Sequence, residues 1–152
     1  DEHTGVLDYA KTVDMIRKQH PRFDFKIIGD GKYKERLDKY KPLGFKENPA
    51  DYLKQHNFAF VSRYLSILEA LVSKRLVFAL YDNPVKRDYL EMAPFAKYII
   101  IADSSKTLTR KVKYFLDNPN QTEKLVNLGY NYAKTQTWDS VVKVYLKLWR
   151  LK

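Results

Sequence analysis

Two short groups of residues in this chain have side-chain types and spacing that could bind a phosphate or a sugar hydroxyl. Gly29-Asp30-Gly31 follows an apolar segment and precedes a charged one. Glycines at such a turn let the backbone approach a phosphate group. Glu69 is the only acidic residue between Asp51 and Asp82. Its carboxylate can accept two hydrogen bonds from neighbouring hydroxyls, such as the diol of a ribose.

Each group also has a purely structural interpretation. The spacing of Gly29 and Gly31 matches neither a dinucleotide fingerprint nor a P-loop, and a tight turn between strand and helix would need the same glycines. Ser66 and Glu69 have the spacing of a capping box, which stabilises a helix start by roughly 1 kcal/mol without any ligand. Arg63 could pair with a diphosphate or point into solvent. Both interpretations stay open on spacing alone.

Several kinds of chemistry are excluded or lack support. The chain contains no cysteine, so it has no disulfide, thiolate metal site or cysteine nucleophile. The three histidines, His3, His20 and His56, are scattered, and no metal-ligand spacing or nucleophile–base pattern connects them. We therefore expect no metal site and no other cofactor, and we assign no catalytic residue.

The elements that must position these groups centre on residues 57–83. The continuous apolar runs at 58–61 and 75–81 predict two strands buried on both faces, and Ser66 is expected to begin a helix between them. A strand–helix–strand unit implies a parallel sheet, whose ligands bind at the carboxyl ends of the strands. The loop at 62–66 and the turn at 82–84 should therefore border a site.

The rest of the chain extends this pattern. Further strands are expected at 23–28, 42–45 and 96–102, and helices at 5–20, 33–40, 50–55, 85–93, 104–117, 120–135 and from 138 to the end. We expect one Rossmann-like α/β domain over residues 1–152. It would hold a parallel sheet of about five strands, flanked by helices and closed by a helical C-terminal tail.

The net charge of +10 favours anionic partners: nucleotide phosphates, an anionic membrane surface or nucleic acid. No nucleic-acid motif is present, so nucleic acid is not an expected partner. The last predicted helix has an apolar face with an opposite stripe of Lys143, Lys147 and Arg150, which is either solvated or a peripheral membrane contact. No apolar run has the length of a membrane span, and no signal peptide is recognised. We expect a cytoplasmic protein, with peripheral contact at the inner membrane face as an open alternative.

The order of FKIIGDG, LGF, FAFVS, SILEALVSKRLVFA and TWDSVVKVYLKLW resembles the C-terminal, donor-binding domain of GT-B retaining glycosyltransferases of the group 1, or family 4, type. The resemblance covers nearly the whole chain, and ILEALVSKRLVFA is its most specific part. It implies half of an enzyme that transfers a sugar from a nucleotide diphosphate sugar. The acceptor would be held by an N-terminal domain, so the isolated chain should be inactive.

The resemblance also implies which residues contact the donor. Glu69 matches the family's second motif glutamate, which holds the ribose. The backbone amides of Ile67 and Leu68 match positions near the diphosphate. The remaining implied contacts lie in the loop before that helix, the glycine loop and the segment near the base: Arg63, Tyr64, Ser66, Gly29, Asp30, Gly31, Gly44 and Phe45.

The chain departs from the family pattern at two positions. Val61 stands eight residues before Glu69, where the family has its first motif glutamate, so the carboxylate that contacts the sugar is either missing or replaced by Tyr64 or Arg63. Thr4 precedes Gly5, where the family has a phosphate-binding lysine. The family's first strand and acceptor domain would lie upstream of residue 1. A degenerate, non-catalytic interaction module is therefore an alternative, followed by a basic domain for nucleic acid or membrane surfaces.

Overall fold

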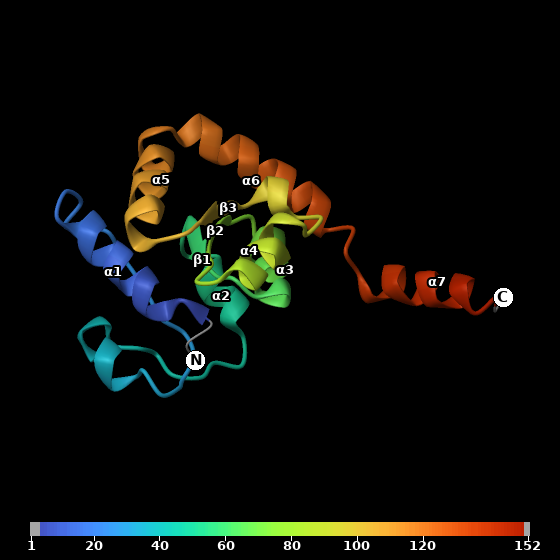
Figure 1. Ribbon diagram of the computed structural model, residues 1–152, viewed down its shortest axis with the longest axis horizontal. Coiled ribbons are helices and arrows are strands. Elements are labelled where there is room, and N and C mark those ends of the chain that lie inside the picture. Colours follow the sequence, from blue (N-terminus) through green and yellow to red (C-terminus); the bar gives the residue numbers. More distant parts are fainter. Residues whose placement is uncertain (1–3, 151–152) are drawn as a thin grey trace.

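The computed structural model describes residues 4–150 and has a parallel sheet at its centre (Figure 1). The strands are β1 (Phe58–Phe60), β2 (Leu76–Leu80) and β3 (Ile100–Ala102), in the order β1-β2-β3. Phe78 of β2 is in register with Phe60 on one side and with Ile100 on the other. All five residues of β2 are buried, as its uninterrupted apolar sequence predicts.

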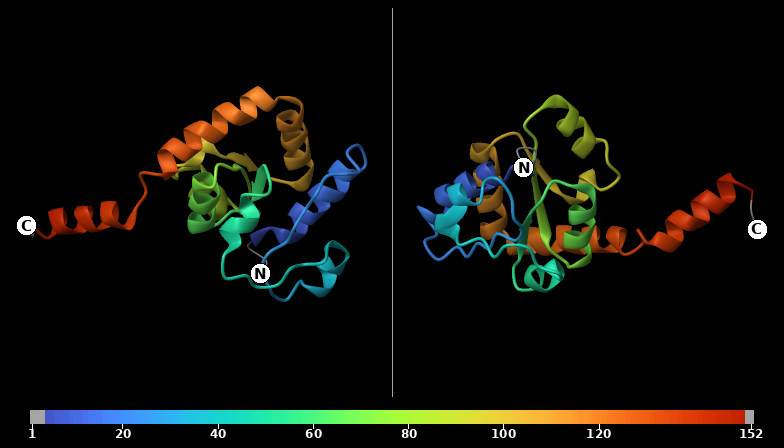
Figure 2. Two further views of the ribbon diagram at one scale, coloured as in Figure 1. Left: turned by 180° about the vertical axis from the view of Figure 1, so that it is seen from behind. Right: turned by 90° about the horizontal axis from the view of Figure 1, so that it is seen from below.

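Helices cover both faces of this sheet (Figures 1 and 2). Leu76, Phe78 and Leu80 pack on the side of α1 and α5, whereas Val77 and Ala79 pack on the side of α3. This alternation along β2 is that of a strand between two helical layers. The helical elements are α1 (Val6–Arg17), η2 (Glu35–Tyr40), α2 (Pro49–Leu53), α3 (Tyr64–Val72), α4 (Pro84–Glu91), η3 (Ala96–Tyr98), α5 (Ser105–Asp117), α6 (Pro119–Ala133) and α7 (Trp138–Leu148).

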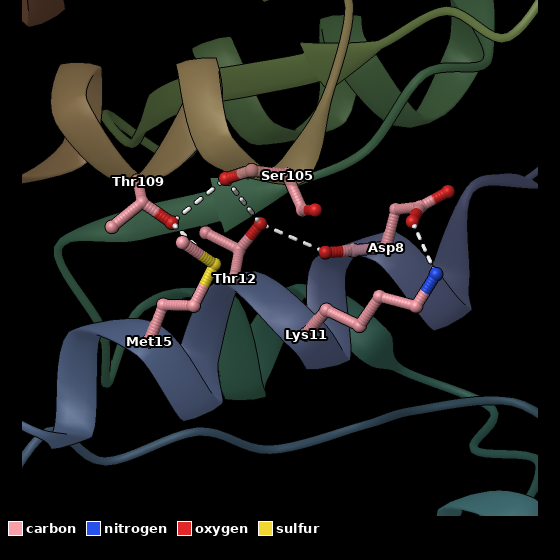
Figure 3. Close-up of polar contacts among 6 residues, drawn as sticks. All are labelled: Asp8, Lys11, Thr12, Met15, Ser105 and Thr109. Atoms are coloured by element: carbon pink, nitrogen blue, oxygen red, sulfur yellow. Dashed lines mark hydrogen bonds and ion pairs between the residues drawn. The ribbon is translucent and has the colours of Figure 1, made fainter.

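The contact between α1 and α5 contains two buried threonines (Figure 3). The Thr12 hydroxyl donates to the backbone oxygen of Asp8 at 2.8 Å, and the Thr109 hydroxyl donates to the backbone oxygen of Ser105 at 2.7 Å. Thr12 also lies 3.4 Å from the Ser105 oxygen, across the interface. Because both hydroxyls are hydrogen-bonded, the two helices pack closely without an unpaired buried polar group. α1 is therefore fixed against the sheet, which matters for the site below.

The prediction of about five strands is wrong for the described residues, which contain three. Residues 23–28 and 42–45 form no strand: the Leu43 N–H donates to the Ile27 oxygen at 2.9 Å, and an isolated antiparallel bridge joins Gly29 to Gly44. Residues 96–98 form the short helix η3, and only the end of the predicted strand enters the sheet. Tyr98 instead stacks on Tyr132 of α6, with ring centroids 5.0 Å apart. These segments are rich in apolar residues, but a strand also needs a hydrogen-bonded neighbouring strand.

The predicted capping box at Ser66 is also wrong. α3 begins at Tyr64, its N-cap residue is Arg63, and no side chain caps it. Arg63 has an extended backbone, and its carbonyl already accepts from Ile67 N–H at 2.9 Å. Ser66 is thus the third residue inside the helix. The Ser-x-x-Glu spacing is compatible with this position as well, because residues three apart share one helix face.

α7 is present as predicted, but it does not close the domain (Figure 1). It extends away from the sheet and its flanking helices, and its apolar side chains are exposed; these include Trp138, Val141, Val142, Tyr145, Leu148 and Trp149. Within residues 4–150, no helix combines the length and apolar character required to cross a bilayer.

Candidate functional site

A cavity of about 1030 Å³ lies beside β1. Residues 22–31 line one wall, and residues 57–63 with the start of α3 line the other. At the carboxyl end of β1, the wall contains Gly29, Asp30 and Gly31 from one side and Ser66 and Glu69 from the other. The fold therefore brings together the two groups that the sequence distinguished, as expected for the carboxyl edge of a parallel sheet.

The glycine loop presents open backbone to this cavity. Gly29 and Gly31 have φ values of 120° and 156°, in the region that other residues rarely adopt, and a Cβ added at either would meet nothing within 4 Å. The Asp30 carboxylate accepts from the Gly31 N–H at 2.8 Å and from the Lys34 ammonium at 3.1 Å. These hydrogen bonds hold the pKa of Asp30 below its usual range. Asp30 thus stabilises the loop by occupying the Gly31 N–H, while the Gly29 N–H donates to the Gly44 oxygen.

One face of α3 lines the cavity, and the opposite face is core. Ser66 and Glu69 are one turn apart on the cavity side, and Glu69 is exposed, whereas Ile67 is fully buried. The Ile67 N–H donates to the Arg63 oxygen, so it is used by the helix. The N–H groups that precede the first intrahelical bond, including those of Leu65 and Ser66, are the ones available to an anion at this end.

Other predicted contacts lie elsewhere. The Tyr64 ring packs on Phe95, with centroids 5.2 Å apart, and Leu68 packs against the core on the α3 side of the sheet. Gly44 is hydrogen-bonded to Gly29 and does not line the cavity. Phe45, next to it, does line the cavity and is 81% exposed. The cavity therefore includes Phe45 and Arg63 but leaves out Tyr64, Ile67, Leu68 and Gly44.

Lys86 is a positively charged residue near the site that the sequence analysis did not single out. Burial lowers the pKa of Lys86, the charge of nearby Arg63 lowers it further, and Asp82 partly opposes both effects. The backbone N–H of Lys86 caps α4 by donating to the Asn83 side chain at 2.9 Å. Arg63 and Lys86 thus place two positive charges near Asp82 at the carboxyl end of β1 and β2, and of the two cations only Arg63 lines the cavity. No periodicity in the sequence indicates this proximity, because it arises only on folding.

Tyr9 of α1 is a second residue at the site that the sequence analysis did not single out. Its hydroxyl accepts from the Leu80 N–H at 3.0 Å, and Ser62, which follows β1, is hydrogen-bonded both to Tyr9 and to the Thr4 backbone oxygen. Burial raises the pKa of Tyr9 to about 12, although the hydrogen bonds oppose this shift. These contacts fix the start of α1 at the carboxyl end of β1, where Thr4 and Tyr9 line the cavity.

Residues 4–150 contain no cluster of three His, Asp or Glu side chains that could hold a metal ion. His3 lies outside the described residues. The geometry therefore defines an α/β domain with an open cavity at the carboxyl end of a parallel sheet, lined at its mouth by both basic and acidic side chains.

No protein-family model and no curated protein matches the chain. Solved structures do match it. One is an S. aureus TarM variant in complex with Fondaparinux, alpha-GlcNAc-glycerol and UDP, with 17% identity and a TM-score of 0.75 over 94% of this chain and 32% of that one. Sucrose-phosphate synthase from Thermosynechococcus elongatus matches with 15% identity and a TM-score of 0.73 over 99% of this chain and 42% of that one, and the pneumococcal O-GlcNAc transferase GtfA in complex with UDP and GlcNAc matches with 15% identity and a TM-score of 0.72 over 97% of this chain and 33% of that one.

The chain thus has the fold of one domain of a GT-B glycosyltransferase, and the predicted resemblance is confirmed for the fold. It spans between 32% and 42% of the length of the three neighbours named above.

Proposed function

We propose that the chain is the donor-binding domain of a glycosyltransferase, and that it binds a nucleotide diphosphate sugar at the mouth of the cavity beside β1. One observation carries this proposal. The glycine loop at 29–31 and the cavity face of α3 meet at the carboxyl edge of the sheet, in a fold whose neighbours include two transferases solved with UDP. The sugar would pass to an acceptor held by a second domain.

Each group at the mouth has a role in this proposal. The Glu69 carboxylate accepts two hydrogen bonds from the ribose hydroxyls. The N–H groups at the start of α3, with Arg63 and Lys86, face the diphosphate, because a helix N-terminus and cations attract negative charge. The glycine loop gives the donor room to approach the backbone, and Phe45 lies beside the base. No metal or other cofactor is needed for this binding mode.

The same groups would assist the transfer itself. When the bond between the sugar and the diphosphate breaks, the leaving diphosphate gains negative charge. Preorganised cations and helix dipoles stabilise that charge more in the transition state than in the ground state. Arg63 and the first turn of α3 are placed for this electrostatic role. Glu69 would then act as a binding residue that anchors the nucleotide, and the protein's catalytic residues remain unassigned.

Isothermal titration calorimetry with UDP and GDP tests the binding mode. Loss of hydrogen bonds to a charged group costs about 1.5–3 kcal/mol, so Glu69→Gln should weaken nucleotide binding roughly 10- to 100-fold. Glu123→Gln, at an exposed position on α6, is the matched control and should bind like wild type. The assignment of Glu69 fails if its variant binds equally well, and the proposed function fails if wild type binds neither nucleotide.

The alternative of a degenerate, non-catalytic module rests on Val61. It packs against the core where the family pattern would have a glutamate, so this chain offers no carboxylate there. Transfer by the longer parent protein, measured with a panel of nucleotide sugars, separates the two functions. Reproducible sugar transfer excludes the non-catalytic module, whereas nucleotide binding without transfer excludes the active enzyme.

We also propose α7 as a contact with an anionic membrane surface. Its exposed apolar side includes Trp138 and Trp149, and Lys143 and Lys147 lie on its opposite side. Aromatic residues opposite lysines are typical of helices that lie in the membrane interface. Sedimentation with vesicles of phosphatidylserine and phosphatidylcholine should deplete the protein from solution, and phosphatidylcholine alone should not. Equal binding of a variant with Lys143→Glu and Lys147→Glu would contradict this contact.

A further inference from the structure

Three residues on the cavity side of α3 lie in a row. Arg63, Ser66 and Glu69 all line the cavity, and each is three positions from the next. Residues at this spacing share one face of a helix, and each step of three advances about 4.5 Å along the helix axis. Arg63 is the N-cap residue, so it lies beyond the first turn of α3, on the side away from Glu69.

This order matches the order of the groups in the ligand of the proposed function. In a nucleotide diphosphate sugar, the ribose, the diphosphate and the sugar follow one another along the molecule. The ribose is assigned to Glu69 and the diphosphate to the first turn of α3. The sugar then comes next along the row, and Arg63 is the side chain of this row that it meets.

The other polar side chains at this end of the cavity are hydroxyls that already have hydrogen-bond partners. The Ser62 hydroxyl donates to the Thr4 backbone oxygen at 3.3 Å. The Tyr9 hydroxyl accepts from the Leu80 N–H at 3.0 Å. The guanidinium of Arg63 is therefore the charged group that this part of the cavity wall presents to a sugar.

The carboxylates on the cavity wall lie elsewhere. Among residues 4–150 they are those of Asp24, Asp30 and Glu69. Asp30 is hydrogen-bonded within the glycine loop on the opposite side, and Asp24 lies six residues earlier on that same wall. A neutral sugar therefore finds no carboxylate on the wall beside Arg63 to accept from its hydroxyls, whereas a negatively charged sugar finds a cation.

The charges behind Arg63 also favour a negative group. Lys86 and Asp82 lie close to it, although neither lines the cavity: beyond the effect of burial, Asp82 raises the pKa of Lys86 and Arg63 lowers it. Two cations and one carboxylate thus lie together, and a carboxylate from a ligand would balance their charge. A guanidinium has five N–H donors in a planar fork, so Arg63 can bind a carboxylate through two parallel hydrogen bonds and keep its other contacts.

We propose that the donor carries an acidic sugar, a uronic acid whose C6 is a carboxylate, and that Arg63 is the residue that selects it; this specificity rests on the proposed function. A uronic acid differs from the corresponding hexose only at C6, where the carboxylate replaces a hydroxymethyl group. Arg63 would distinguish the two at that single position, because a bidentate pair between guanidinium and carboxylate is specific in geometry as well as in charge.

Calorimetry with pairs of donors that differ only at C6 tests this specificity. The pairs are UDP-glucuronic acid with UDP-glucose, and UDP-galacturonic acid with UDP-galactose. Wild type should bind at least one uronate roughly 10- to 100-fold more tightly than its neutral partner. Arg63→Gln should bring that ratio to within about twofold. The readout is the ratio, because any contact of Arg63 with the diphosphate affects both donors of a pair alike.

Two further variants separate a specific contact from general attraction between opposite charges. Arg22→Gln removes the same charge from the cavity lining, seven residues before the glycine loop, and should leave the ratio unchanged. Arg63→Lys keeps the charge but loses the planar fork, so it should restore only part of the preference that Arg63→Gln removes.

Several results would overturn the proposal. One is equal binding of both uronates and their neutral partners by wild type. Another is a preference that survives Arg63→Gln, or one that Arg22→Gln lowers as much. Binding of UDP alone separates these failures from failure of the proposed function: UDP binding without a uronate preference leaves the donor site intact, whereas absence of UDP and GDP binding rejects both. If only GDP binds, GDP-mannuronic acid and GDP-mannose form the pair, with the same expected ratios.

Discussion

Replacing Tyr9 with phenylalanine tests how the end of β2 is stabilised. The Leu76 N–H points towards β1, and the Leu80 N–H leaves β2 on the same side, but β1 pairs with β2 only as far as Phe78. The Tyr9 hydroxyl accepts from Leu80 N–H instead, and both residues are at least 96% buried. Tyr9→Phe keeps the ring and leaves that N–H without its acceptor.

The expected cost follows from this burial. A buried donor that loses its partner costs about 1–3 kcal/mol, so we expect the free energy of unfolding to fall by about 2 kcal/mol. For a chain of this size, that loss corresponds to a decrease of roughly 4–8 °C in Tm. Tyr114→Phe is the control, because Tyr114 lies half-exposed on α5. This variant should lower the free energy of unfolding by no more than about 0.5 kcal/mol.

The same substitution should change how stability depends on alkaline pH. Burial raises the pKa of Tyr9 to about 12, whereas an unfolded tyrosine titrates near 10. The contribution of the protonated Tyr9 to folding stability is therefore complete below pH 10 and is lost as the pH rises towards 12, because the unfolded chain releases the proton first. Between these pH values, ionisation of Tyr9 alone lowers the free energy of unfolding by up to about 1.4 kcal/mol per pH unit. Tyr9→Phe should remove this pH dependence.

Urea unfolding followed by circular dichroism at pH 8, and at intervals from pH 9.5 to 11.5, measures both effects. Tyr40, Tyr89 and Tyr132 also have pKa values raised by burial, but they are common to wild type and variant, so the difference between the two curves isolates Tyr9. The reasoning is refuted if Tyr9→Phe costs under 0.5 kcal/mol at pH 8, or if both proteins lose stability equally above pH 10.

Two further predictions concern helix packing and capping. Gly129→Ala should destabilise the protein by about 1–2 kcal/mol in thermal unfolding, because the added Cβ would lie 2.6 Å from Cδ2 of the fully buried Leu71. An increase in Tm would contradict this prediction and show that the contact between α3 and α6 can relax. Asn83→Ala should cost about 1 kcal/mol because its side chain caps α4, and Ser66→Ala should cost under 0.5 kcal/mol because Ser66 caps nothing. Equal losses for these two variants would restore the capping box at Ser66.

The parts of the fold that sequence predicted well are those specified by local apolar pattern. The run around β2 indicated a strand buried on both faces, and α1, α5 and α6 followed from apolar residues at helical spacing. The start of α3 was misplaced because Ser-x-x-Glu spacing occurs at a cap and within a helix alike. The extended backbone of Arg63, which decides between them, is not encoded in that spacing.

The site shows the same division between local and distant information. The rule that ligands of parallel sheets bind at the carboxyl ends of strands predicted that the loop at 62–66 and the turn at 82–84 border a site. Ser62, Arg63 and Ser66 line the cavity, whereas residues 82–84 do not. The hydrogen bond from Leu80 to Tyr9 joins residues 71 positions apart, and the proximity of Arg63 to Lys86 also arises only from folding. Pattern and spacing contain no signal for such pairs, so these residues had to be found in three dimensions.

The absence of a strand at residues 23–28, where the sequence predicts one, has a physical explanation. Phe23, Phe25 and Ile27 alternate with polar residues, which predicts a strand with one apolar face, and their side chains do pack against the core near α1. Residues 23–28 have no ladder because no strand lies between them and β1, not because their pattern is unsuited to one.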